Sequence, residues 1–192
     1  MQFKEIEIKF DAEKIKREAF LEIIETLPIR KKMNVSSYDT YFVNNTGDFI
    51  RYRWTDDKGE LTIKRKTIKA NNNDRIEVNL PTAGGSEFPT IEAFCSLLGY
   101  KLNFEIFKTC SIFWVDKVVL VYYVVFDKEL NELRRFIEIE ANEDLEWESE
   151  EKAWAEVLKY EKIFEALDIT PQNRLRKSLF EIFRKPLQLM VV

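Results

Sequence analysis

The stretch Glu-Ile-Glu-Ile-Lys at residues 5–9 alternates charged and apolar side chains, and Phe-Ile-Glu-Ile-Glu at residues 136–140 repeats this alternation. Such alternation is typical of a β-strand, where side chains two apart share a face and lie roughly 7 Å from each other. Each stretch therefore predicts a strand with carboxylates on one face and isoleucines on the other. Two such strands placed together would be able to hold a cation.

Further β-rich segments, separated by turns that contain Gly or Asn, complete a set of about eight expected strands. Besides the first stretch, strands are expected at residues 38–43, 49–54, 61–66, 75–80, 104–114, 118–126 and 133–141. Helices are expected at residues 12–27, from Pro89 to Gly99, at 153–167, and from a cap at Thr170 onward to Phe183. This order predicts an α+β fold: one domain over residues 1–192, built as an eight-stranded antiparallel β-barrel with flanking helices.

Charge and hydropathy narrow the class of protein. The chain has 30 basic and 34 acidic side chains, a net charge of −4, which argues against a protein that coats nucleic acid. There is no apolar run long enough for a membrane span, and the charged N-terminus is unlike a signal peptide. We therefore expect a cytoplasmic protein without nucleic-acid or membrane partners, either a monomer or a homodimer.

The chain contains no histidine, which removes the commonest general base and the usual zinc ligand. Chemistry would then depend on carboxylates, amines and guanidinium groups, a set that favours Mg²⁺ or Mn²⁺ over zinc or copper. Cys95 and Cys110 have no metal-binding spacing, so both are expected to be free thiols.

Charged residues at every second position mark one face of several expected strands. These residues are Glu5, Glu7, Lys9, Arg51, Arg53, Lys64, Lys66, Arg75, Glu77, Glu138 and Glu140. For any single strand, a solvated face is the ordinary interpretation. If helices cover the apolar face of a curved sheet, however, the charged faces converge in its interior. Burying so many charges is costly unless an ionic ligand and a cation accompany them. A metal-bound polyphosphate would neutralise both, because the metal faces the carboxylates and the phosphates face the lysines and arginines.

The ordered motifs resemble the CYTH superfamily, also called the triphosphate tunnel metalloenzymes. The motifs that carry the resemblance are Glu-x-Glu-x-Lys at 5–9, Tyr-Asp-Thr-Tyr at 38–41, Ile-Arg-Tyr-Arg at 50–53, Thr-Ile-Lys-Arg-Lys at 62–66, Arg-Ile-Glu at 75–77, Asp127, and Phe-Ile-Glu-Ile-Glu at 136–140. They extend over nearly the whole chain. The family includes class IV adenylate cyclases, thiamine triphosphatases and inorganic tripolyphosphatases, so the resemblance implies a tunnel that binds a triphosphate and a divalent metal.

The resemblance also implies a role for each matching residue. The expected metal ligands are Glu5, Glu7, Asp127, Glu138 and Glu140, and Glu5, Glu7, Lys9, Glu138 and Glu140 form the expected catalytic group. The expected phosphate-binding residues are Lys9, Arg51, Arg53, Lys64, Lys66, Arg75, Lys108 and Lys177. Lys177 corresponds to a lysine that the family commonly places before Ser-Tyr in its C-terminal helix, although Leu179 replaces the tyrosine here; a solvated helix residue is the alternative.

Two departures from the family pattern keep the reaction open. A second-half strand that usually carries a basic pair retains only Lys108 here, and Asn79 stands where an acidic residue is frequent. The leading hypothesis is metal-dependent hydrolysis of tripolyphosphate, thiamine triphosphate or a nucleoside triphosphate. The alternatives are a class IV adenylate cyclase, which makes cyclic AMP and pyrophosphate from ATP, and a tunnel that binds polyphosphate or nucleotide without turnover.

Overall fold

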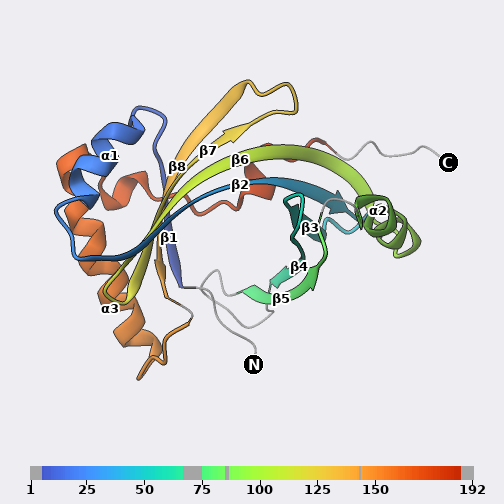
Figure 1. The fold of residues 1–192 in the computed structure, drawn as a ribbon. Helices are drawn as coiled ribbons and strands as arrows, with labels where there is room; N and C mark the ends of the chain where they lie inside the picture. Colours follow the sequence, from blue (N-terminus) through green and yellow to red (C-terminus); the bar gives the residue numbers. More distant parts are fainter. Residues whose placement is uncertain (1–5, 67–74, 85–86, 143, 187–192) are drawn as a thin grey trace. The chain divides into compact units, whose positions relative to one another are not determined.

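The computed structural model describes residues 6–66, 75–84, 87–142 and 144–186, and the side chains of residues 64–66 and 75–77 are not described. The described residues form one eight-stranded sheet, in the order β1-β8-β7-β6-β2-β3-β4-β5 (Figure 1). The strands are β1 (Glu7–Asp11), β2 (Ile29–Val43), β3 (Phe49–Trp54), β4 (Gly59–Lys66), β5 (Arg75–Thr82), β6 (Lys101–Val115), β7 (Val118–Phe126) and β8 (Glu132–Ala141). The α+β fold with an eight-stranded antiparallel sheet is confirmed. Within the described residues β1 and β5 are the two edges of this sheet, so its closure into a barrel stays a prediction.

Four α-helices and two short 3-10 helices accompany the sheet in the described part of the chain. They are α1 (Arg17–Ile24), α2 (Phe88–Leu97), α3 (Glu150–Glu161), η2 (Lys162–Leu167), η3 (Pro171–Asn173) and α4 (Leu179–Phe183). The helix expected over residues 153–167 is thus an α-helix that tightens into a 3-10 helix after Glu161. In α3 the side chain of Ser149 accepts a hydrogen bond from the backbone N–H of Lys152, which caps the helix start.

Several expected elements differ from the structure. The helix expected over residues 12–27 is shorter, because α1 extends only over Arg17–Ile24. Strand β2 begins at Ile29 rather than Tyr38; its first residues are mostly exposed and lack the apolar alternation that would have predicted a strand. The single helix expected from Thr170 to Phe183 is wrong. After η3 the backbone instead pairs with β1, where the N–H of Leu175 donates to the carbonyl of Lys9 at 2.7 Å. That N–H is therefore not available to a helix, and α4 begins only at Leu179.

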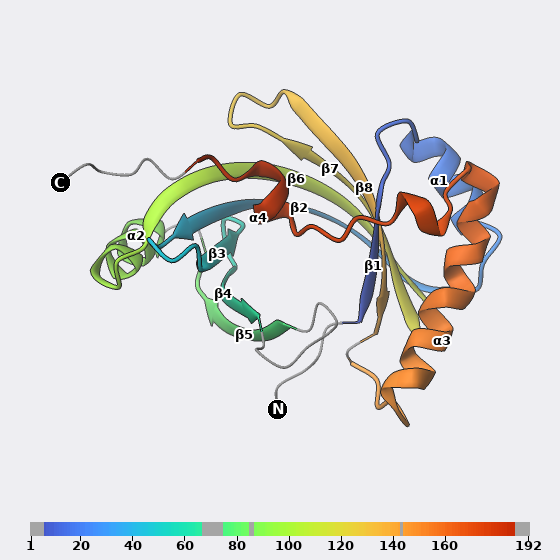
Figure 2. The ribbon, with the colours of Figure 1, turned by 180° about the vertical axis from the view of Figure 1, so that it is seen from behind.

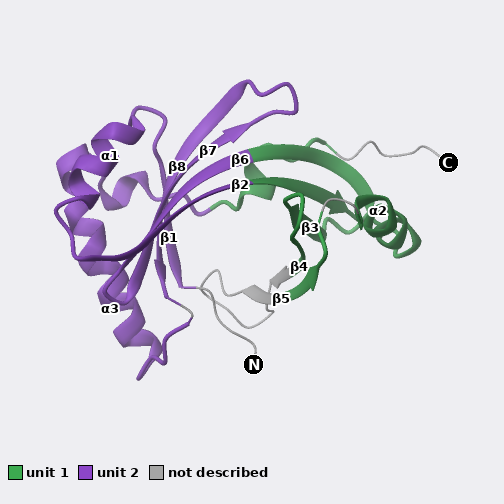
Figure 3. Cartoon of the chain, in the orientation of Figure 1, with its two compact units in different colours: residues 1–2, 37–107, 177–192 green, residues 3–36, 108–176 purple. Residues whose placement is uncertain are grey.

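The chain divides into two compact units (Figure 3). Unit 1 contains residues 1–2, 37–107 and 177–192, and unit 2 contains residues 3–36 and 108–176. The long strands β2 and β6 each contribute one segment to either unit. The prediction that residues 1–192 form a single domain is not tested by this division and stays a prediction.

In unit 2, helices cover the apolar face of the sheet, as expected from the alternating pattern. Phe20 and Ile24 of α1 and Val157 of α3 pack with Ile137 and Ile139 of β8, and all five side chains are buried. Figure 2 shows α1 and α3 on the same side of β1 and β8. The residues on the other face of these strands, which include Glu7, Glu138 and Glu140, are therefore directed away from the helices.

In unit 1, helical cover of the apolar face is incomplete. Phe42, Ile50, Tyr52, Leu61 and Cys95 form a buried cluster with side chains of α2. Further along β4 and β5, Ile63, Val78 and Leu80 remain 42%, 56% and 58% exposed. The condition that helices cover the apolar face is therefore not met at these positions of β4 and β5.

Candidate functional site

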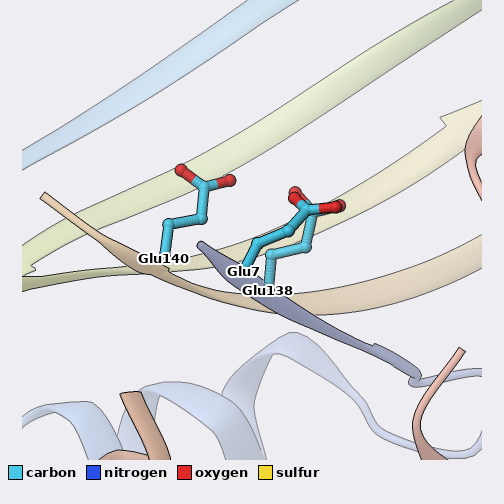
Figure 4. Close-up of side chains that lie close together, drawn as sticks. All are labelled: Glu7, Glu138 and Glu140. Atoms are coloured by element: carbon cyan, nitrogen blue, oxygen red, sulfur yellow. The ribbon is translucent and has the colours of Figure 1, made fainter. Parts of the chain in front are cut away.

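Three of the expected carboxylates lie together on the sheet face opposite the helices of unit 2. In the antiparallel register of β1 and β8, Glu7 is paired with Glu140 and Lys9 with Glu138. One carboxylate oxygen from each of Glu7, Glu138 and Glu140 lies within 4.8 Å of the others. Figure 4 shows the three side chains extending to the same side of their strands. Three carboxylates at this separation offer the oxygen ligands that Mg²⁺ and Mn²⁺ prefer.

Lys9 connects two of these carboxylates. Its ammonium nitrogen lies 2.8 Å from Oε1 of Glu138 and 3.5 Å from Oε1 of Glu7, and the residue is 8% exposed. The hydroxyl of Tyr123 donates a second hydrogen bond to Oε1 of Glu138, also at 2.8 Å. Burial alone raises the pKa of Glu138, but the charge and hydrogen bond of Lys9, the hydrogen bond of Tyr123 and the charge of Lys108 outweigh it and lower the pKa to about 2.

Lys108 lies close to Tyr123 and Glu138. Its ammonium nitrogen lies 5.6 Å from the centre of the Tyr123 ring, and the residue is 4% exposed. Burial, followed by the charge and hydrogen bond of Glu138, raises the pKa of Tyr123 well above its ordinary value, so this hydroxyl stays protonated. The structure thus places Lys9 and Lys108, two expected phosphate-binding residues, with three expected metal ligands.

Two of the three expected arginines, Arg51 and Arg53, lie in unit 1 and contact side chains of neighbouring strands. Arg53 donates from Nε and Nη2 to the two carboxylate oxygens of Asp39, at 2.8 and 3.1 Å, and Asp39 is completely buried. Arg51 donates to the hydroxyl of Thr62 at 2.9 Å and to the carboxylate of Glu60 at 3.3 Å. Arg51 and Arg53 are two residues apart, so their side chains lie on the same face of β3. The contacts with Asp39, Thr62 and Glu60 hold the two guanidinium groups in place there.

Lys177 directly precedes α4 and is exposed rather than part of the helix. Ser178 caps α4, and Phe180 stacks on Phe49 of β3 with ring centres 4.3 Å apart. Phe49 is two residues from Arg51, so the two side chains share a face of β3. Within unit 1, α4 therefore packs against the strand face that carries the arginines.

Asp127 lies apart from the three glutamates. It begins the turn between β7 and β8, where its carboxylate accepts hydrogen bonds from the backbone N–H groups of Glu129 and Asn131 and from the Asn131 side chain. Glu138 is paired with Val121, six residues before Asp127 on the same chain segment. At a rise of about 3.3 Å per residue this separation is roughly 20 Å along the hairpin. The structure thus gives Asp127 a turn-capping role, and its expected metal role stays a prediction.

Four expected site residues are only partly described or not described. Glu5 lies outside the described residues. Lys64 and Lys66 occupy β4, and Arg75 occupies β5, where the register pairs Lys66 with Arg75, but their side chains lie outside the described part of the structure. Their roles in phosphate binding stay predictions from the resemblance.

Two residues with contacts to the expected site were not assigned a role from the sequence. Asp39 was part of a quoted motif, but the strand pattern alone did not show that it would pair with Arg53. Tyr123 lies in an almost uniformly apolar strand, which has no alternation to show which face each residue occupies. The β7–β8 register, which pairs Tyr123 with Phe136, is the signal that places it on the same face as Glu138.

Comparison with known proteins establishes the fold. No protein-family model matches the chain, and no curated protein matches it. A protein from Pyrococcus horikoshii OT3 superposes with a TM-score of 0.72 and 19% identity, over 94% of this chain and 99% of that one. A conserved hypothetical protein from Pyrococcus furiosus gives a TM-score of 0.71 and 23% identity, over 93% and 99% of the two chains.

A third similar structure, a candidate adenylate cyclase from Vibrio parahaemolyticus, gives a TM-score of 0.63 and 14% identity, over 95% of this chain and 98% of that one. At 14% to 23% identity, these likenesses show that the chain shares the fold of these structures. None of the helices in the described residues is both long and apolar enough to cross a membrane.

Proposed function

We propose that this protein is a divalent-metal-dependent enzyme that hydrolyses a triphosphate-containing substrate. The observation that carries the proposal is the grouping of Glu7, Glu138 and Glu140 within 4.8 Å, on the sheet face where Lys9 and Lys108 are also buried. Partly buried carboxylates beside buried ammonium groups suit a ligand that combines a cation with phosphate oxygens. The ordered CYTH-like motifs and the shared fold support the same class of substrate.

In this proposal, each group of residues has a distinct task. Glu7, Glu138 and Glu140 ligate Mg²⁺ or Mn²⁺, and Lys108 contributes positive charge to phosphate oxygens. Lys9 holds Glu7 and Glu138 in place through its two ion pairs. The resemblance also assigns phosphate binding to Arg51, Arg53 and Lys177, because guanidinium forks and ammonium groups suit phosphate oxygens. The bound metal ion would neutralise charge on the phosphates and lower the pKa of the attacking water.

The second candidate function is cyclisation of ATP to cyclic AMP and pyrophosphate. The description of the similar Vibrio parahaemolyticus protein as a candidate adenylate cyclase favours it. The same carboxylates and lysines would then serve attack by the ribose 3′ hydroxyl on the α-phosphorus instead of attack by water. Hydrolysis remains our first choice because the second-half strand that usually carries a basic pair retains only Lys108 here.

A substrate panel tests the proposal. Tripolyphosphate, thiamine triphosphate and ATP are each incubated with the protein in Mg²⁺ or Mn²⁺, and orthophosphate, pyrophosphate and cyclic AMP are measured together. Orthophosphate release that requires the metal supports hydrolysis, whereas pyrophosphate with cyclic AMP supports cyclisation. Triphosphate binding without any product would show a binding protein and refute both enzymatic functions.

Two matched variants identify the site in this assay. Glu7→Gln removes a metal-ligating charge with little change of shape, and we expect it to reduce turnover at least 100-fold. Glu22→Gln makes the same change at an exposed position of α1, and we expect turnover equal to the unmodified protein. Undiminished turnover of Glu7→Gln would contradict the assignment of the glutamate cluster as the active site.

A further inference from the structure

Tyr123 has a fixed position beside the glutamate cluster. It lies in β7 opposite Phe136 of β8, with 2% of its surface exposed. Its ring stacks on Phe136 with ring centres 5.0 Å apart, and the ammonium nitrogen of Lys108 lies 5.6 Å from the ring centre. A ring enclosed in this way has little freedom to move, so its hydroxyl is held in one place.

The hydroxyl of Tyr123 and the ammonium of Lys9 both donate to one oxygen of Glu138. Each lies 2.8 Å from Oε1. A carboxylate oxygen has two lone pairs, so two donors use the hydrogen-bonding capacity of Oε1. Among the described residues, none donates a hydrogen bond to Oε2, although the Glu138 side chain keeps 14% of its surface exposed.

The two donors come from the two strands that flank β8. In the sheet order, β8 lies between β1, which carries Lys9, and β7, which carries Tyr123. One donor would leave the carboxylate free to rotate about its last bond, because that torsion is broad. Two donors from the two flanking strands hold Oε1 in place and so restrict this rotation. The position of Oε2 is then fixed as well, on the side of the carboxylate that does not receive these two hydrogen bonds.

We propose that Tyr123 is a positioning residue that, together with Lys9, fixes Oε1 of Glu138 and thereby presents Oε2 to the metal as a single-oxygen ligand. This inference rests on the proposed function, because it needs Glu138 to bind a metal ion. It adds a residue that the sequence motifs did not include. Hydrogen bonds to metal-ligating groups orient them, and removing one typically weakens metal affinity by about 10- to 100-fold.

The test compares two single-atom deletions on neighbouring residues. Tyr123→Phe removes the hydroxyl but keeps the ring between Phe136 and Lys108. Tyr122→Phe is the matched control, because Tyr122 is equally buried on the opposite face of β7 and donates its hydroxyl to the carbonyl of Ile15 at 2.9 Å. Mn²⁺ affinity of each protein is measured by titration calorimetry, and bound Mn²⁺ is examined by electron paramagnetic resonance; thermal unfolding checks that each variant is folded.

We expect Tyr123→Phe to weaken Mn²⁺ binding by about 10-fold or more and to change the spectrum of the bound ion, whereas Tyr122→Phe leaves both unchanged. Equal Mn²⁺ affinity of Tyr123→Phe and the unmodified protein would overturn the inference while leaving the proposed function intact. Equal weakening by both variants would also overturn it, since a general loss of stability would then explain the effect. An unmodified protein that binds neither Mn²⁺ nor Mg²⁺ would instead refute the proposed function.

A double variant tests whether Tyr123 acts through Glu138. In a Glu138→Ala background, Tyr123→Phe is expected to change Mn²⁺ affinity less than 2-fold, because the carboxylate that it positions has been removed. A full 10-fold loss in that background would show that Tyr123 affects the metal by another route and would overturn the positioning role.

Discussion

Replacing Lys9 by methionine tests the electrostatics of the glutamate cluster in the absence of any ligand. Methionine keeps much of the unbranched side-chain volume but removes the ammonium that lies 2.8 Å from Glu138. Glu138 would keep its hydrogen bond from Tyr123 and lose its closest opposite charge. Because both side chains of the pair are largely buried, at 9% and 14% exposure, the remaining carboxylate cannot regain full hydration.

The size of the expected loss of folding free energy follows from the pKa of Glu138. Its lowering from the ordinary 4.5 to about 2 corresponds to roughly 3 kcal/mol of folding free energy at pH 7, and Lys9 is the largest of the lowering causes. Because the folded-state pKa is below the unfolded one, this contribution is complete above about pH 5 and is lost as the pH falls toward 2. We therefore expect Lys9→Met to cost about 3 kcal/mol at pH 7 and only about 1 kcal/mol at pH 3.

The assay is urea unfolding at both pH values, in chelator, followed by tryptophan fluorescence. Lys14→Met is the matched control, because Lys14 is exposed and its replacement is expected to change the free energy of unfolding by less than about 0.5 kcal/mol. A loss for Lys9→Met that is equally large at pH 3 and pH 7 would refute the electrostatic reasoning and indicate a packing defect. A negligible loss at pH 7 would show that the ion pair contributes little to stability.

Three further predictions concern other parts of the fold. Asp39→Asn should cost about 2 kcal/mol in urea unfolding, because Arg53 loses its charged acceptor, while Asp56→Asn at an exposed position should be neutral; equal effects would contradict the pairing. Burial raises the pKa of Cys95 to about 11, so this thiol should resist iodoacetamide at pH 8 until urea is added, and mass spectrometry of the native protein would reveal any contrary labelling. Phe180→Ala should cost at least about 3 kcal/mol, because the ring is 3% exposed, and a loss below about 1 kcal/mol would argue against close packing of α4.

Strands with a β-rich stretch between clear turn residues were predictable from the sequence. The expected bounds of β3, residues 49–54, and of β7, residues 118–126, match the structure, because local pattern and turn residues agree there. The start of β2 was not predictable in this way. Its exposed polar residues carry no periodic signal, and the neighbouring strand β6 supplies hydrogen bonds that a local pattern does not reveal.

The candidate site, too, was predictable from the sequence only in part. The period-two spacing of Glu138 and Glu140 was enough to predict that they share a face, and their joint position with Glu7 followed once two strands were expected to pair. The spacing could not show that Asp127 caps a turn, because that depends on the length of the β7–β8 hairpin. Nor could it show that Asp39 faces Arg53, since a one-residue change of register would separate them.

The sequence by itself determined which residues could share a strand face, because the backbone of a strand fixes the direction of successive side chains. It also determined the available chemistry, because a chain without histidine must use carboxylates, lysines and arginines. Only the tertiary structure decided that Tyr123 and Lys9 meet at one oxygen of Glu138, since these residues come from three strands. Contacts between strands depend on register, and register is set by the packing of the whole sheet rather than by any local stretch of sequence.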